Sequence, residues 1–302
     1  EALAGLTSAP KTLPCKWLYD ERGSQLFDQI CEAGDYYPTR TEMQIMRTEI
    51  ADIASEVGRN AMLIEYGSGS SMKTRLLLDA CPEIAGYVPL DISREHLLKA
   101  AEEIAKDYPH LPIYPVVADY TQPFELPEAV LAVEDRVVYF PGSTIGNFHP
   151  DDARAFLKNV ARVVGPGGGM LVGVDLRKDP ARLEAAYNDS EGVTAAFNLN
   201  LLTRMNRELD SDFPVERFEH RAVWNPDIGR VEMRLWALDD CVVSVGGETV
   251  AFEAGESIHT ESSYKYTLDG FARLVDAADF RVEDVWTDPE ALFSIQLLRR
   301  KG

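Results

Sequence analysis

A glycine-rich segment with an acidic start, Glu65-Tyr66-Gly67-Ser68-Gly69-Ser70, follows an apolar run at residues 61–66 and precedes a helical stretch. Glycines at such a strand-to-helix turn let the backbone approach a ligand closely. The segment is not a G-x-G-x-x-G dinucleotide motif, because position 72 is methionine, and it lacks the G-x-x-x-x-G-K spacing of a phosphate-binding loop. It therefore predicts either a plain tight turn or a ligand-binding turn of another kind.

Acidic residues also follow the next two apolar runs. Asp91 ends the run at 87–90, and Asp119, next to Tyr120, follows the run at 113–117. The carboxyl ends of parallel strands share one edge of a sheet, so these side chains should face one ligand. A carboxylate can accept both hydroxyls of a ribose, and Asp119 would lie beside an adenine amino group. Together with Glu65, the pattern matches methyltransferases that use S-adenosylmethionine.

The hydrophobic pattern predicts a scaffold that can position these residues. Short apolar runs alternate with helical stretches, which is typical of parallel strands covered by helices on both faces. The expected strands are 61–66, 87–90, 113–117, 136–140 and 170–174, and the expected helices are 73–78, 94–106 and 151–164. We therefore expect an α/β fold, a Rossmann-like, doubly wound parallel sheet.

The pattern changes after residue 175 and returns near residue 268. Residues 178–208 are expected to be helical with an interruption at Gly192, and residues 218–260 alternate like antiparallel strands. A helix at 268–278 and strands at 281–286 and 293–299 return to the sheet. We expect a core of residues 43–177 plus 266–302, and an inserted α+β substrate-binding domain or lid of residues 1–42 plus 178–265.

The first part of that expected lid contains no strong strand. A short helix is expected at residues 25–31, and a long amphipathic helix is expected at residues 41–57. Between them, residues 35–40 are expected to form a loop, because Pro38 disfavours helix at and before its position.

Composition excludes several classes of function. The formal net charge of -20 repels phosphate backbones and anionic lipids, so neither nucleic acid nor a membrane is an expected partner. The four cysteines are far apart, and the five histidines show no metal-binding spacing, so we expect reduced thiols and no metal. No apolar run is long enough to span a bilayer, and the first residues lack a signal-peptide layout. A cytoplasmic location is expected.

Five longer motifs carry a specific resemblance. They are Tyr19-Asp20-Glu21-Arg22-Gly23-Ser24-Gln25-Leu26-Phe27, Tyr36-Tyr37-Pro38-Thr39-Arg40-Thr41-Glu42, residues 67–74, residues 140–148 and Thr260-Glu261-Ser262-Ser263-Tyr264-Lys265-Tyr266. In these motifs, which occur in order over nearly the whole chain, the sequence resembles the L-histidine Nα-methyltransferase family of ergothioneine biosynthesis, which includes fungal enzymes that methylate tryptophan derivatives. The resemblance implies a class I methyltransferase core and trimethylation of the α-amino group of histidine to hercynine.

The resemblance also implies roles for individual residues. The residues that would bind S-adenosylmethionine are Gly67, Ser68, Lys73, Asp91, Asp119 and Tyr120. The residues that would bind or act on the amino acid are Tyr19, Phe27, Tyr36, Gly142, Asn147, Tyr187, Met233, Glu261 and Ser263. Asn147 and Tyr187 would hold the carboxylate with Tyr36 nearby, Glu261 and Ser263 would read the imidazole, and Met233 would limit the space near the ring. Tyr19 and Phe27 would lie beside the amino group, with Tyr19 and Asn147 as the catalytic candidates.

Alternatives remain for both residues and function. Without the resemblance, Tyr36 would be a packing residue, Asn147 a turn residue and Glu261 a solvated charge at a strand end. Ser262 departs from the apolar residue expected there, and its side chain should point away from Glu261 and Ser263 if the segment is a strand. The alternative functions are methylation of another aromatic amino acid, such as tryptophan or a derivative, and a non-catalytic scaffold that binds S-adenosylmethionine.

Overall fold

The computed structural model describes residues 1–68 and 72–302, which divide into two compact units. Unit 1 comprises Glu1–Arg40 and Arg177–Lys265, and unit 2 comprises Thr41–Leu176 and Tyr266–Gly302. Each unit has its own sheets, and each is described by itself below.

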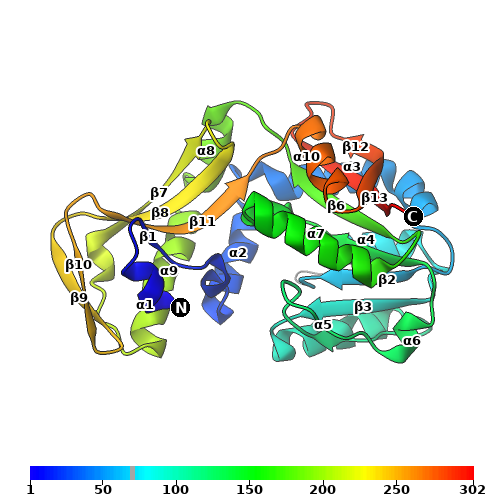
Figure 1. Ribbon diagram of the computed structural model, residues 1–302, viewed down its shortest axis with the longest axis horizontal. Helices are drawn as coiled ribbons and strands as arrows, with labels where there is room; N and C mark the ends of the chain where they lie inside the picture. The colour runs from blue at the N-terminus through cyan, green and yellow to red at the C-terminus, as the bar shows by residue number, and fades with distance from the viewer. Residues whose placement is uncertain (69–71) are drawn as a thin grey trace. The chain divides into compact units, whose positions relative to one another are not determined.

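Unit 2 is built on a seven-stranded sheet with the order β12-β13-β6-β5-β2-β3-β4 (Figure 1). The strands are β2 (Met62–Tyr66), β3 (Gly86–Asp91), β4 (Val116–Val117), β5 (Arg136–Phe140), β6 (Gly169–Asp175), β12 (Phe280–Thr287) and β13 (Phe293–Arg300). Strands β2 to β6 run parallel, and β13 runs antiparallel to both β6 and β12. The strand order reverses at β2, so the ligand-binding edge of the sheet lies at the carboxyl ends of β2 and its neighbours.

Helices cover both faces of this sheet, which explains why its central strands β2, β5 and β6 are almost continuously buried. The elements are α3 (Tyr37–Val57), α4 (Met72–Ala80), α5 (Arg94–Asp107), α6 (Glu128–Leu131), η2 (Thr144–Asn147), α7 (Pro150–Val164) and α10 (Leu268–Asp276). On one face, Phe156 of α7 and Phe271 of α10 pack with Ile64 of β2. On the other, Met46 of α3 and Leu77 of α4 pack in a separate core. The predicted α/β class and parallel core are confirmed.

Unit 1 contains a four-stranded sheet of order β1-β11-β8-β7 and a separate β9-β10 hairpin (Figure 1). The strands are β1 (Lys11–Thr12), β7 (Phe218–Asn225), β8 (Arg230–Ala237), β9 (Cys241–Val245), β10 (Glu248–Phe252) and β11 (Ser257–Tyr264). The helices are α1 (Ala2–Leu6), η1 (Cys15–Leu18), α2 (Glu21–Glu32), α8 (Pro180–Tyr187), α9 (Val193–Glu208) and η3 (Val215–Arg217). Burial alternates along β7, as it does in a strand with one covered face. Because β1 pairs with β11, the N-terminal segment joins the sheet that carries Glu261.

The predicted loop at residues 35–40 holds only for Asp35 and Tyr36, because α3 begins at Tyr37 and includes Pro38. Proline is tolerated in the first turn of a helix, where its missing N–H would have no intrahelical partner. The Arg40 guanidinium stabilises this start by donating to the Ala33 carbonyl at 2.7 Å and the Gly34 carbonyl at 2.7 Å. The helix predicted at 25–31 also starts earlier, at Glu21, where the Asp20 side chain caps it by accepting from the Gly23 N–H.

Two further predictions can be compared with the described elements. The strand predicted at 113–117 is shorter, because only Val116–Val117 forms a ladder and Ile113 makes an isolated bridge to Tyr87. The interruption at Gly192 is confirmed, since this residue lies between α8 and α9 with a φ of 73°. None of the helices in residues 1–68 and 72–302 is long and apolar enough to cross a membrane.

Candidate active site

The turn after β2 in unit 2 has the features of a ligand-binding turn. Gly67 has a φ of 71°, which favours glycine, and its N–H donates to the Leu90 carbonyl at 2.8 Å. The Ser68 side chain is buried, and its Oγ has no hydrogen-bond partner within the described residues. A buried hydroxyl without a partner is costly, so a ligand group here would stabilise it. Residues 69–71 of the predicted motif lie outside the described residues.

The two predicted strand-end acids are oriented by their own turns. Asp91 is the last residue of β3, and its Oδ1 accepts from the Ser93 N–H at 2.7 Å. Burial raises the pKa of Asp91 above its usual value. Asp119 accepts from the Thr121 N–H at 2.9 Å and from the Thr121 hydroxyl at 2.6 Å. Tyr120 stacks on Tyr66, with ring centroids 5.6 Å apart and planes 9° from parallel. These contacts give unit 2 two fixed carboxylates and an aromatic surface.

Glu65, expected to belong with these acids, has another role. Its carboxylate is buried and accepts from the Thr74 hydroxyl at 2.8 Å and from the Tyr87 hydroxyl. Burial raises the pKa of Glu65 to about 7. The expectation that Glu65 faces the nucleoside is therefore wrong, because its oxygens are used inside the protein to join β2, α4 and β3.

A partly buried ion pair that the sequence did not predict connects two predicted site residues. Glu42 of α3 is 1% exposed and forms an ion pair with Lys73 of α4. Its two oxygens also accept from the Gly142 N–H at 3.0 and 2.9 Å. Gly142 has a φ of 76°, which favours glycine at this turn. Glu42 thus fixes both the lysine expected to bind the cofactor and the loop after β5. The sequence placed Glu42 at the end of the motif of residues 36–42, but nothing there indicated its contacts with Lys73 and Gly142.

Asn147 lies in the same loop, at the end of η2, and is half-buried. The loop is held by Ser143, which has a φ of 58° and accepts from the Asp175 N–H through its Oγ at 2.9 Å. Thr144 donates to the Pro141 carbonyl at 3.1 Å. Asn147 and Tyr187, both expected to bind the substrate carboxylate, belong to different units.

Unit 1 brings together the residues expected to read the imidazole. Glu261 and Ser263 lie on β11, and Met233 of β8 is the register partner of Glu261. The Ser263 and Tyr187 hydroxyls are 2.8 Å apart. Lys265 Nζ donates to Tyr187 at 2.7 Å and to Ser263 at 2.8 Å. We call the four side chains of Tyr187, Glu261, Ser263 and Lys265 the Glu261 cluster.

Glu261 differs from its neighbours because one of its oxygens has no donor. The side chain is buried, and Oε2 has no hydrogen-bond partner in the described part of the chain. Burial raises the pKa of Glu261 to about 7, an effect that the positive charge of Lys265 partly opposes. An unpaired buried acceptor costs free energy, so a ligand N–H at Oε2 would be favoured.

Aromatic rings of unit 1 form two groups, one of which includes Tyr187 of this cluster. Tyr36 packs edge-on against Tyr187 with centroids 6.0 Å apart, and burial raises its pKa well above the usual value. Tyr19 packs against Phe27 at 5.5 Å and against Phe197 of α9 at 5.4 Å. Phe197 was not predicted, because nothing in its helical stretch distinguishes it from a core residue. Unit 1 therefore joins Tyr19 and Phe27 in one aromatic group and Tyr36 and Tyr187 in a second.

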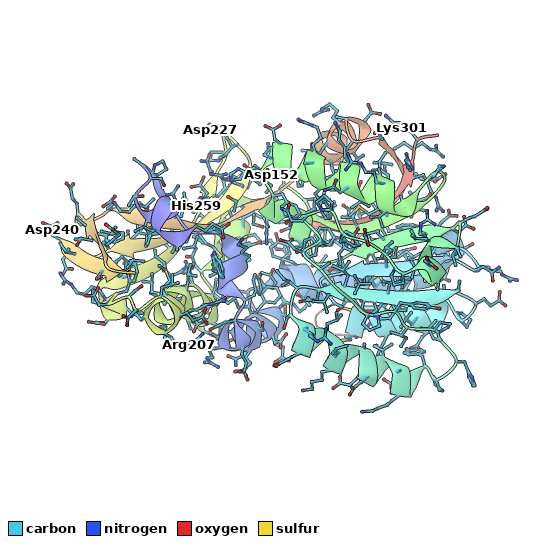
Figure 2. The ribbon with its side chains drawn as sticks, turned by 60° about the horizontal axis from the view of Figure 1, so that its bottom comes forward. Asp152, Arg207, Asp227, Asp240, His259 and Lys301 are labelled. Atoms are coloured by element: carbon cyan, nitrogen blue, oxygen red, sulfur yellow. The ribbon has the colours of Figure 1, made fainter. Side chains whose placement is uncertain are left out.

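Ser262 behaves as its position in a strand predicts. Its Oγ bonds to Nε2 of His259, at 3.1 Å, whereas the neighbouring Ser263 bonds to Tyr187. His259, labelled in Figure 2, is partly buried, and its pKa is lowered to about 4, mainly by burial. No group of three or more acidic, histidine or cysteine side chains in residues 1–68 and 72–302 could hold a metal ion.

Comparison with known proteins assigns the chain to a family. A family model described as "Histidine-specific methyltransferase, SAM-dependent" matches residues 1–300. Histidine N-alpha-methyltransferases of Mycolicibacterium smegmatis and Mycobacterium tuberculosis are 44% and 42% identical, each over 98% of this chain and 93% of the relative. A Burkholderia thailandensis N-methyltransferase structure, with 13% identity and a TM-score of 0.50 over 98% of this chain and 94% of that one, has the same fold. The chain belongs to the histidine-specific methyltransferases that depend on S-adenosylmethionine.

Proposed function

We propose that this protein transfers three methyl groups from S-adenosylmethionine to the α-amino group of L-histidine and so forms hercynine, a step of ergothioneine biosynthesis. Family membership supports the reaction. The observation that carries the choice of substrate is the Oε2 atom of Glu261, a buried acceptor without a donor, next to the Ser263 hydroxyl. A neutral imidazole offers one N–H donor and one nitrogen acceptor, which matches this pair.

We assign the imidazole to Glu261 and Ser263. Ionised Glu261 would accept the ring N–H in a charge-assisted hydrogen bond, and Ser263 would donate to the other nitrogen. Met233, directly across from Glu261 in the register, would limit the ring to the size of an imidazole. An indole has no acceptor nitrogen, so it could not accept the hydrogen bond that Ser263 would donate to an imidazole.

The same proposal gives unit 2 the cofactor. Asp91 would accept the ribose hydroxyls, and Asp119 with Tyr120 would bind the adenine. Gly67 allows the backbone to approach the ligand, and the Ser68 hydroxyl supplies a buried group that has no partner among residues 1–68 and 72–302. Lys73, held by Glu42, completes this set.

The reaction needs alignment more than covalent help from the protein. The sulfonium supplies an electrophilic methyl carbon, and in each transfer an N–C bond forms as the C–S bond breaks. The amine must lose one proton before each of the three transfers. We propose that Tyr19 or a water orders the amine, while Asn147 and Tyr36 orient the carboxylate end. Tyr187, whose hydroxyl bonds to Ser263 and Lys265, would serve the imidazole end instead. The faces of nearby tyrosines would stabilise the growing cationic head group.

Mass spectrometry of histidine incubated with the protein and S-adenosylmethionine tests this proposal. We expect successive products with one, two and three added methyl groups, ending at the trimethylated betaine. Tryptophan assayed in parallel should remain unmodified at the same enzyme concentration. Methylation of tryptophan in preference to histidine would support the alternative substrate, and methylation of neither would support a non-catalytic scaffold.

The expected partners and location follow the same reasoning. We propose a small amino acid as the partner, because the strongly acidic composition disfavours nucleic acid and anionic lipid. We also propose a cytoplasmic location, which the four free cysteines support.

A further inference from the structure

Lys265 is a buried ammonium group whose cost requires an explanation. The residue is 2% exposed and directly follows β11. Its Nζ donates to the Tyr187 hydroxyl at 2.7 Å and to the Ser263 hydroxyl at 2.8 Å, and it lies 4.7 Å from the centre of the Tyr187 ring. Burying a charge is expensive, and an apolar residue of similar volume often fills such a place at lower cost. The position therefore suggests a role beyond packing.

The hydrogen-bond arrangement gives Lys265 control over the Ser263 hydroxyl. An ammonium group only donates, so both hydroxyl oxygens accept from Lys265. In the bond between the two hydroxyls, one of them donates to the other. When Tyr187 donates to Ser263, the Ser263 hydrogen remains available for a ligand. A ligand nitrogen with a lone pair favours this arrangement, because it can accept the free Ser263 hydrogen. Lys265 then donates to Tyr187, and Tyr187 donates to Ser263.

Lys265 also balances the charge of Glu261. Burial raises the pKa of Glu261, and Lys265 has the opposite effect. Cys15, Tyr36 and His220 beside the cluster are uncharged near neutral pH, because burial raises the pKa values of Cys15 and Tyr36 and lowers that of His220, which bonds to the Tyr187 carbonyl. The Arg177 guanidinium donates to the Lys265 carbonyl at 3.2 Å, not to a side chain of the cluster. One negative and one positive charge form a neutral site. A neutral ring fits this site, whereas an imidazolium ring would direct a second N–H toward Ser263, whose oxygen already accepts from an ammonium.

We propose that Lys265 determines specificity for the neutral imidazole ring, by making Ser263 a hydrogen-bond donor and by balancing the charge of Glu261. This inference rests on the proposed function and assigns to Lys265 the discrimination between neutral imidazole and imidazolium at the same site. Lys265 contacts the two hydroxyls rather than the ring, so it is a positioning residue.

The test is histidine binding to the full chain, measured by titration calorimetry with S-adenosylhomocysteine present at several pH values. Wild-type affinity should rise from about pH 6 to pH 8, because both Glu261 and free imidazole lose protons before they pair. Lys265→Met should bind histidine roughly tenfold to hundredfold more weakly at pH 8. The affinity of this variant for histidine should change little between pH 6 and pH 8. Without the ammonium, one proton remains on the Glu261 carboxylate or the imidazole ring in the complex, so binding does not depend on releasing it.

Two further variants separate the contributions. Lys265→Gln keeps an N–H donor but has no charge, so it should recover part of the affinity while its pH profile stays flat. Lys11→Met removes a partly buried lysine of the same unit, which pairs with Glu256 and lies over Phe252. This control should keep the wild-type affinity and the wild-type rise with pH.

The results distinguish the inference from the proposed function. Folding of each variant is judged by circular dichroism and thermal melting, and Lys265→Gln replaces Lys265→Met if the latter does not fold. If wild type methylates histidine and a folded Lys265 variant keeps the wild-type affinity and rising profile, the inference is overturned alone. If wild type does not methylate histidine, the proposed function is overturned, and the inference with it.

Discussion

Four glutamates are buried among the described residues, and Glu261 differs from the other three; Glu232 of unit 1 is paired with Arg230 and Arg234. In unit 2, Glu42 accepts from Lys73 and Gly142, and Glu65 accepts from Thr74 and Tyr87. In unit 1, Glu261 is equally enclosed, but its Oε2 has no donor within the described residues. Burial raises the pKa values of both Glu65 and Glu261 to about 7, so burial and pKa alone do not separate them.

The difference lies in what completes each carboxylate. The unit 2 glutamates have donors from other parts of their own unit, and they tie helices and loops to the sheet. The Oε2 atom of Glu261 accepts no hydrogen bond within the described residues, as expected of a carboxylate that binds a donor group of a ligand. We therefore interpret Glu42 and Glu65 as parts of the scaffold and Glu261 as part of the substrate site. The predictions below test this division.

The largest expected effect is on Glu42, whose two oxygens accept from Lys73 and from the Gly142 N–H. Glu42→Ala leaves the half-buried Lys73 ammonium and the Gly142 N–H without their acceptor. Removing one partner of a fully buried ion pair typically costs about 3–5 kcal/mol, and because Lys73 can regain some hydration, the free energy of unfolding should fall by about 2–4 kcal/mol. Chemical denaturation measures it. Glu42→Gln, which keeps an acceptor for Gly142, should lose less, and a fully stable Glu42→Ala would contradict the scaffold role.

Asp91 represents the opposite case in unit 2, a strand-end acid assigned to a ligand. Asp91→Ala should weaken S-adenosylmethionine binding by roughly 1.5–3 kcal/mol, the range for a hydrogen bond to a charged group. Stability should change much less than in Glu42→Ala. Calorimetry with the folded variant measures the affinity, and an unchanged value would remove the ribose assignment.

Glu261 should cost stability in the absence of ligand. Burial raises its pKa from 4.5 to about 7, so the folded protein holds this proton more tightly than the unfolded chain does. The stability from this group is full below about pH 4.5 and is lost as the pH rises to about 7. Glu261→Gln has no such proton, so at pH 8 it should be more stable than wild type, by on the order of 2 kcal/mol.

Denaturation at pH 4.5 and at pH 8 measures this difference. The gain in Glu261→Gln should disappear at the lower pH, and Glu65 contributes equally to both proteins, so its titration cancels. A variant less stable than wild type at pH 8 would mean that Glu261 is satisfied in the folded protein, like Glu65.

The smallest expected effects come from two adjacent serines that form a matched pair. Ser263→Ala removes the hydroxyl assigned to the imidazole, and Ser262→Ala removes the one that bonds to His259. Each should cost about 1 kcal/mol of stability. Only Ser263→Ala should raise the KM for histidine, by severalfold. Equal KM values for the two variants would contradict the assignment of Ser263.

Much of the fold was predictable from sequence because it depends on local patterns. Apolar runs of strand length alternate with helical stretches, and they identified β2, β3, β5 and β6. The start of α3 was not predicted, because Pro38 is a helix breaker in one context and a tolerated first-turn residue in another. The division of labour between a cofactor core and a substrate lid remains a prediction.

The site was less predictable where it depends on contacts between distant segments. Glu42 reaches Gly142 across 100 positions, and Lys265 reaches Tyr187 across 78, so no local spacing reveals either contact. Glu65 was assigned to the ligand because it is the first residue of the glycine motif. The motif does not indicate that its side chain is buried. Motif resemblance nevertheless named Tyr187, Met233, Glu261 and Ser263, which the structure places together in unit 1.

The most direct test of the account is the histidine KM of Glu261→Ala, with tryptophan assayed in parallel and Glu261→Ala/Met233→Val as the second variant. Loss of the acceptor should weaken histidine recognition by about 1–3 kcal/mol and raise the KM accordingly. The double variant should gain activity toward tryptophan. It removes the Glu261 charge, which an indole leaves unpaired, and it shortens the side chain at Met233, the register partner of Glu261. A folded Glu261→Ala with the wild-type KM for histidine would contradict the claim that Glu261 reads the imidazole.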